Sequence, residues 1–196
     1  MIKRCVSLLI VAIILLLGMT SCGYFSKPSD EEMKKAVAGL LPDAYTATYI
    51  VYGPGLKLDE EEKKEFDRVN DVTPYKNAHY IKVDEEEPYN TEKEIRELVR
   101  KVFSKDYADE VLAYAFENSE YMSRYHEYGG VLAMEVVQNA PMDMLDEIFV
   151  DTLTVIEGNA YACTVEVEAT QNGEKRNVKI QMVFENEKWM FNGPAY

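Results

Sequence analysis

The stretch from Thr91 to Val137 constrains the fold more than any other part of the chain, because it begins with a strong helix signal. Thr91 and Glu94 have the spacing of a capping box, in which each side chain bonds the backbone N–H of the other residue. An apolar stripe with helical spacing follows, formed by Ile95, Leu98, Val99, Val102 and Phe103. The pattern predicts a helix that begins after Thr91 and buries one face.

A second helix and a hairpin are predicted directly after this helix. Ser104 is a second candidate cap. It precedes a shorter apolar stripe formed by Tyr107, Val111, Leu112, Ala115 and Phe116. After Asn118 the period changes to two, and the runs 121–128 and 131–137 flank Gly129-Gly130, a pair able to take the positive φ values of a tight turn. We expect the rest of the chain to pack on this helix–helix–hairpin unit.

The region before Thr91 is predicted to contain one more helix and two short strands. Ser29 and Glu32 form another capping pair, and the apolar stripe that follows predicts a helix up to Leu41, ended by Pro42. Residues 44–52 are rich in Tyr, Thr, Ile and Val, which favours a strand. Residues 79–83 form a second strand candidate. The charged residues 58–66 fit either a solvated loop or a short surface helix.

The C-terminal part of the chain has the pattern of an antiparallel meander. Four β-rich runs (148–156, 160–170, 175–185 and 188–191) are separated by turn residues at 157–159, 171–173 and 186–187. In the second run Cys163, Val165, Val167 and Ala169 alternate with polar residues, so one face should be buried against helices. The prediction is an α+β fold of helices packed on a curved antiparallel meander, which resembles cystatin-like and NTF2-like folds. None of the connections between the predicted helices and strands has the length or composition of a linker, so residues 30–196 are expected to form one domain.

The first 21 residues are predicted to be a signal peptide. Lys3 and Arg4 precede an apolar run from Leu8 to Leu17, and small residues lead up to Cys22. A retained transmembrane helix is the alternative, but the run falls short of the roughly 20 apolar residues that a span needs. Residues 19–22 (MTSC) resemble the lipobox of bacterial lipoproteins, which implies cleavage before Cys22 and lipid attachment to it. An ordinary cleaved signal with an incidental Cys is the other alternative.

Lipid attachment would place residues 22–29 as a short tether and the domain on the extracytoplasmic face of the cell membrane. The chain carries 35 acidic and 21 basic residues, a net charge of −14, and loss of Lys3 and Arg4 would make the mature protein two charges more negative. Such a protein repels nucleic-acid phosphates, so nucleic acid is not an expected partner. A basic protein partner or simple solubility fits the charge better.

The sequence shows no recognisable reaction chemistry. Cys163 lies among apolar residues and is predicted to be a core residue, while His79 and His126 do not have metal-ligand spacing. Residues 84–87 (DEEE) lack the alternating ligands and glycine of a calcium loop, so a solvated turn is expected. We therefore expect no catalytic residue, metal or cofactor, although residues distant in sequence could still converge in the fold. The 14 tyrosines fit either half-buried strand positions or a recognition surface.

A family resemblance appears in the central region. It is carried by Tyr75, Tyr80, residues 91–107 (TEKEIRELVRKVFSKDY), residues 125–132 (YHEYGGVL) and the closing strands with Trp189. This pattern resembles the IseA family of secreted inhibitors of peptidoglycan D,L-endopeptidases, and more loosely lipoproteins of similar build from Firmicutes. The resemblance covers roughly residues 73–137. The chain departs from the family through its lipobox and the additional helix at residues 29–41.

The resemblance implies a cystatin-like inhibitor that blocks the catalytic groove of an NlpC-type cysteine peptidase, a cell-wall hydrolase, in a Gram-positive cell. The hairpin would then contact the enzyme through five residues: Tyr121, Arg124, Tyr125, Glu127 and Tyr128. Two other functions remain open at this point. An NTF2-like binding module would enclose an apolar pocket for a small ligand or wall fragment. An enzyme would require a pair of acidic side chains brought together in a cavity.

Overall fold

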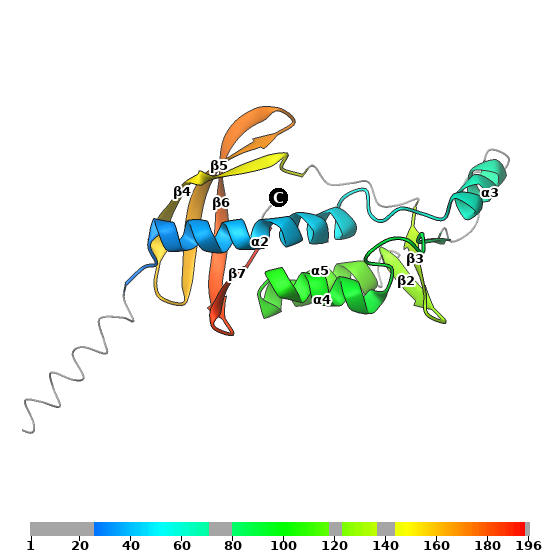
Figure 1. The fold of residues 1–196 in the computed structure, drawn as a ribbon, viewed down its shortest axis with the longest axis horizontal. Coiled ribbons are helices and arrows are strands. Elements are labelled where there is room, and N and C mark those ends of the chain that lie inside the picture. Colours follow the sequence, from blue (N-terminus) through cyan, green and yellow to red (C-terminus); the bar gives the residue numbers. More distant parts are fainter. Residues whose placement is uncertain (1–25, 71–79, 118–122, 137–143, 195–196) are drawn as a thin grey trace, which may run out of the picture.

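The computed structural model describes residues 26–70, 80–117, 123–136 and 144–194, which form helices and two antiparallel sheets (Figure 1). The helices are α2 (Asp30–Val51), α3 (Glu60–Asn70), α4 (Glu92–Val102) and α5 (Lys105–Phe116). The strands are β1 (Tyr80–Lys82), β2 (Tyr125–Tyr128), β3 (Val131–Glu135), β4 (Glu147–Gly158), β5 (Ala162–Gln171), β6 (Glu174–Glu185) and β7 (Lys188–Phe191). The predicted α+β class is confirmed.

Helix α2 is longer than the sequence predicted. It continues through Pro42, so the prediction of a helix end there is wrong, and the predicted strand at residues 44–52 is the second half of the same helix. The apolar stripe continues past the proline with helical spacing. Its buried members include Met33, Val37, Leu41, Ala44, Thr48 and Val51. The helix packs on β4 and β7 near its start and also contacts α4 and α5, so it links the two ends of the molecule (Figure 1).

Helices α4 and α5 form as predicted, each with its expected cap. Thr91 Oγ1 accepts a hydrogen bond from the Glu94 N–H at 3.3 Å, and the Glu94 carboxylate accepts one from the Thr91 N–H at 3.1 Å, which confirms the capping box. Ser104 Oγ accepts from the Tyr107 N–H at 3.3 Å. The Ser104 N–H also donates to the Phe191 carbonyl at 2.7 Å, so the joint between the helices is fastened to β7.

The strands divide into two sheets, with orders β1-β3-β2 and β4-β5-β6-β7. The second is the predicted meander. Its strand β5 alternates as expected, with Cys163, Val165, Val167 and Ala169 buried in the core. The predicted hairpin is β2–β3, and β1 pairs with it to make the first sheet. Of the two alternatives for the charged segment 58–66, the surface helix is confirmed, because most of the segment belongs to α3.

The segment that leads into α2 is fixed to the edge strand β4. Lys27 Nζ donates to the Val155 carbonyl at 2.8 Å, and the Asp30 carboxylate accepts from the Val155 N–H at 2.7 Å. Both outward backbone groups of Val155 are therefore satisfied by side chains from the helix entry. Within the described ranges, no helix combines the length and hydrophobicity that a membrane crossing requires.

Candidate partner-binding site

The structure places two of the predicted contact residues in the interior. Arg124 is 4% exposed and Tyr125 is 0% exposed, so neither can contribute to a surface that a partner touches in this conformation. The prediction that Arg124 and Tyr125 are exposed contact residues is therefore wrong. Tyr121 and the predicted lipidation site Cys22 lie outside the described residues. Of the predicted hairpin residues, Glu127 and Tyr128 are exposed.

Arg124 and Tyr125 connect the base of the hairpin to the end of α2. Arg124 Nη2 donates to the Gly53 carbonyl at 2.9 Å, and the Tyr125 hydroxyl donates to the Ile50 carbonyl at 2.8 Å. Gly55 has a φ of 87°, and a Cβ there would lie 2.3 Å from Met134 Sδ and 2.7 Å from Arg124 Nη2. Glycine is favoured at this position because an L side chain is strained at this φ and would also displace the ends of the Met134 and Arg124 side chains. These bonds hold the hairpin in a fixed position relative to α2.

The tip of the hairpin presents two apolar side chains to solvent. Tyr128 is 65% exposed and Val131 is 43% exposed, and the two residues are directly paired across the strands. Gly129 and Gly130 form the turn between them with φ values of 61° and 84°, as the sequence predicted. Paired residues lie on the same face of a sheet, so the tip forms a small continuous apolar surface.

An aromatic row supports the tip from behind, formed by Tyr80, His126 and Tyr128. The rings of His126 and Tyr128 are stacked with centroids 5.0 Å apart, and the ring of Tyr80 meets His126 edge-on at 5.2 Å. The Tyr80 hydroxyl donates to the Ser123 carbonyl at 2.6 Å, which ties this end of the row to the backbone. Burial, with a smaller contribution from Glu135, raises the pKa of Tyr80 to about 12. The row limits the rotamers open to Tyr128.

Glu127 is held in place by helix α4. Its carboxylate accepts a hydrogen bond from the Glu92 N–H at 2.8 Å, in the first turn of that helix, where the unpaired N–H groups favour a negative charge. The carboxylate therefore has a defined position near the tip of the hairpin, on the opposite face of β2 from Tyr128. Together, Glu127, Tyr128, Val131 and the aromatic row define what we name the hairpin surface.

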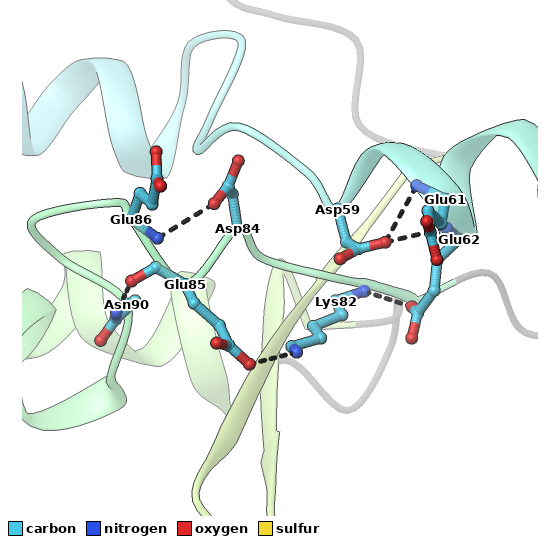
Figure 2. A network of polar contacts seen from close by, with 8 residues as sticks. All are labelled: Asp59, Glu61, Glu62, Lys82, Asp84, Glu85, Glu86 and Asn90. Atoms are coloured by element: carbon cyan, nitrogen blue, oxygen red, sulfur yellow. Dashed lines mark hydrogen bonds and ion pairs between the residues drawn. The ribbon is translucent and has the colours of Figure 1, made fainter.

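Figure 2 shows the network of charged side chains beside the hairpin, between α3 and the turn after β1. Lys82 is its centre: the Lys82 N–H donates to the Glu62 carboxylate at 2.9 Å, and Nζ lies 2.6 Å from the Glu85 carboxylate. Asp59 accepts two N–H bonds at the start of α3. The hydrogen bond from Lys57, 2.6 Å long, lowers the pKa of Asp84. These contacts bind the acidic turn at residues 84–87 to its neighbours; Glu85 and Glu86 are exposed, while Asp84 and Glu87 are half-buried.

A shallow groove lies on the other side of the Gly53–Lys57 turn. It has a volume of about 330 Å³ and lies between α2, this turn and the segment at residues 87–89. Its apolar lining consists mainly of Tyr49, Ile50, Pro54, Leu56, Pro88 and Tyr89. It is a surface groove and differs from the enclosed apolar pocket expected of an NTF2-like binding module.

Cys163 is a core residue, as predicted. It is buried on the inner face of β5, and burial raises the pKa of its thiol to about 11. His79 lies outside the described residues. Within the described ranges, no group of three or more His, Cys, Asp or Glu side chains has an arrangement that could hold a metal ion.

No protein-family model and no curated protein matches the sequence of this chain.

The hairpin surface contains residues that the sequence reasoning did not select, His126 and Val131. Strict alternation along β2 predicts that His126 lies on the outer face together with Tyr128, while Tyr125 points inward. This pattern was the available signal for His126. The direct pairing of Tyr128 with Val131 follows from the two-residue Gly129-Gly130 turn. The support from Tyr80 could not be predicted in the same way, because β1 is separated from β3 by two helices and its register is fixed only in the fold.

Proposed function

We propose that this chain is a lipid-anchored interaction protein on the extracytoplasmic face of a Gram-positive cell membrane. In this proposal its partner is a cell-wall D,L-endopeptidase of the NlpC cysteine-peptidase type, whose activity it inhibits or modulates. The chain acts by binding and contributes no catalytic group of its own. The resemblance of residues 73–137 to IseA-type inhibitors suggests the partner, and the hairpin surface supports a role in binding.

The observation that carries the proposal is the exposed Tyr128–Val131 pair on a hairpin whose conformation is already fixed. Large exposed aromatic side chains are the residues that most often dominate protein–protein binding energy. Stacking on His126 and the turn geometry restrict Tyr128 before a partner arrives, so little conformational entropy is lost on binding. Glu127 adds a positioned negative charge that can pair with a basic group of the partner.

The test measures binding and inhibition with a purified NlpC-type D,L-endopeptidase digesting peptidoglycan. We expect saturable inhibition with 1:1 binding by the wild-type chain. Tyr128→Ala should weaken the affinity about 30-fold, because truncation of a central aromatic contact costs about 2 kcal/mol. Tyr49→Ala is the matched control, since Tyr49 is 48% exposed but lies on α2 and is not part of the hairpin surface.

Two outcomes would contradict the proposal at different levels. If no enzyme of this type binds the chain, the identity of the partner is wrong. If an enzyme binds but Tyr128→Ala and Tyr49→Ala have equal effects, the partner is right and the hairpin surface is the wrong site.

A second candidate function is a binding module for a small ligand or wall fragment. The groove beside Tyr49 and Tyr89 favours it, because two tyrosines and two prolines line this groove, which has a volume of about 330 Å³. Titration with soluble peptidoglycan fragments distinguishes the two functions. Binding that Tyr49→Ala abolishes and Tyr128→Ala leaves unchanged would support the module.

A further inference from the structure

Apart from Tyr49 on α2, the exposed large apolar side chains of the described residues gather at two ends of the molecule. Tyr128 and Val131 belong to the hairpin surface. Ile156, Tyr161 and Phe184 lie at the opposite end, where β4 turns into β5 and β6 runs toward β7. In Figure 1 these two turns lie at the same end of the four-stranded sheet, and the three-stranded sheet lies at the other end of α2. The hairpin surface accounts for only one of the two apolar ends.

The aromatic residues at the second end form a connected set. Tyr161 is 48% exposed and Phe184 is 38% exposed, and the Phe184 N–H donates to the Tyr161 carbonyl at 2.7 Å. The ring of Phe184 meets the ring of Trp189 edge-on with centroids 5.4 Å apart. The indole N–H of Trp189 donates to the Glu32 carboxylate at 2.8 Å, which fixes this set to the first turn of α2. We name Ile156, Tyr161, Phe184 and Trp189 the aromatic end.

The position of the helix entry brings this aromatic end close to the lipid anchor. Lys27 and Asp30 hold the chain on Val155, in the same strand as Ile156. Lys27 follows Cys22 by only five positions in the sequence, and five steps of extended chain span at most about 18 Å. The hairpin lies beyond the far end of α2, and a helix of 22 residues is about 33 Å long. The aromatic end can therefore reach a surface that holds Cys22, while the hairpin points away from it.

We propose that the aromatic end rests in the headgroup region of the phospholipid bilayer that carries the lipid anchor. The inference rests on the lipid anchoring in the proposed function. Tyr and Trp favour the membrane interface because they combine an apolar ring with a polar group. The net negative charge opposes the approach to an anionic bilayer, but repulsion is screened beyond about 8 Å at physiological salt. The short tether also raises the local concentration of the aromatic end at the surface.

In this arrangement the bilayer and the wall enzyme bind opposite ends of one rigid unit. The hairpin surface would face outward into the cell wall, at a distance from the membrane set by α2. A partner reached in this way lies in the wall layer, which agrees with the class of enzyme proposed above.

The test uses Trp189, the only tryptophan of the chain, as a reporter. The mature lipidated protein, beginning at Cys22, is incorporated into vesicles of phosphatidylcholine and phosphatidylglycerol, some of which contain a lipid with a nitroxide on its headgroup. We expect loss of Trp189 fluorescence in the nitroxide vesicles relative to the plain ones. Trp189 is only 7% exposed, so the readout is the nitroxide in the headgroup region, which quenches over a distance, and not a quencher dissolved in water.

The matched control moves the tryptophan to the other end of the molecule. A Trp189→Phe, Tyr128→Trp double variant should lose little fluorescence in the same vesicles, because its tryptophan lies on the distant hairpin. Circular dichroism checks that the variant is folded. In the otherwise unaltered chain, Tyr161→Ser should reduce the quenching of Trp189.

Each failure identifies a different error. If the protein does not float with the vesicles, the lipid anchoring fails and this inference falls with it. If it floats and Trp189 is not quenched, the anchor is correct and the aromatic end does not touch the bilayer. If the protein forms a dimer without lipid and Phe184→Ala abolishes that dimer, a second copy of the chain occupies this surface and the proposal is overturned. Inhibition of the endopeptidase is measured separately and does not depend on these results.

Discussion

The thiol of Cys163 illustrates how the environment of one residue controls its chemistry. It lies on the inner face of β5, and burial, with a smaller contribution from the Glu32 carboxylate, raises its pKa from 9.0 to about 11. Only the thiolate is nucleophilic. The site therefore keeps the thiol protonated at neutral pH, and the residue acts as a small apolar side chain.

We predict that Cys163 reacts slowly with iodoacetamide in the native protein. The raised pKa alone lowers the thiolate fraction at neutral pH by about 100-fold, and burial lowers the rate further. The rate should increase on unfolding in urea to that of a free thiol. The measurement is mass spectrometry of the alkylated protein over time. Equal rates in the native and unfolded states would show that Cys163 is accessible.

At the scale of single residues, the sequence predicted the core positions better than the surface ones. Cys163 was assigned correctly because β5 alternates without interruption. Arg124 and Tyr125 were selected for the surface because of their residue types, which are common at interfaces. Their burial depends on hydrogen bonds to the Gly53 and Ile50 carbonyls, more than 70 residues away, and no local pattern indicates these partners.

At the scale of elements, the proline inside α2 predicts that replacing Pro42 will stabilise the protein. Proline lacks the N–H that would bond the carbonyl four residues earlier, and its ring clashes with that carbonyl. Pro42 is exposed, so its removal leaves no cavity. We expect Pro42→Ala to raise the free energy of unfolding by about 1–3 kcal/mol, measured by urea denaturation.

A control in the same helix separates the proline effect from general helix propensity. Gly39 is exposed, and a Cβ there would meet no atom within 4 Å. Gly39→Ala should stabilise by about 0.5–1 kcal/mol, less than Pro42→Ala. A loss of stability in Pro42→Ala would mean that the helix requires the proline.

The error in α2 has a physical reason. Pro42 and the β-branched and aromatic residues after it suggested a helix end followed by a strand, which local propensity supports. The tertiary structure overrides this preference, because a single long helix buries Leu41, Ala44, Thr48 and Val51 against its neighbours. The helical spacing of these residues was present in the sequence and carried more information than their propensities. Where spacing and caps agreed, as at Thr91 and Ser104, the predicted helices were confirmed.

At the scale of the whole molecule, the buried Tyr125 and the half-buried Tyr80 predict a loss of stability at high pH. Burial is the main cause that raises the pKa values of Tyr80 and Tyr125 to about 12 in the folded protein. The pKa of tyrosine in an unfolded chain is about 10, so above this pH the unfolded state releases protons more readily than the folded state. The stability is fully present below pH 10, and the free energy of unfolding should fall as the pH rises from 10 toward 12.

Urea denaturation at a series of pH values measures this fall. Tyr125→Phe provides the comparison, because phenylalanine cannot ionise. At neutral pH this variant should lose about 1 kcal/mol with the hydrogen bond to the Ile50 carbonyl, and its stability should decrease less steeply above pH 10. An identical slope in both proteins would show that Tyr125 does not contribute to the pH dependence.

The contacts of Lys27 and Asp30 with Val155 also protect the protein from self-association. Strand β4 is an edge strand of 12 residues, and unpaired N–H and C=O groups on such an edge can pair with a strand of another molecule. The two side chains occupy both outward groups of Val155 and so interrupt the edge in the second half of the strand. Proteolytic removal of the segment before α2 would separate Lys27 from the domain and open this part of the edge, so cleavage of the tether would release a form that is prone to aggregate through β4.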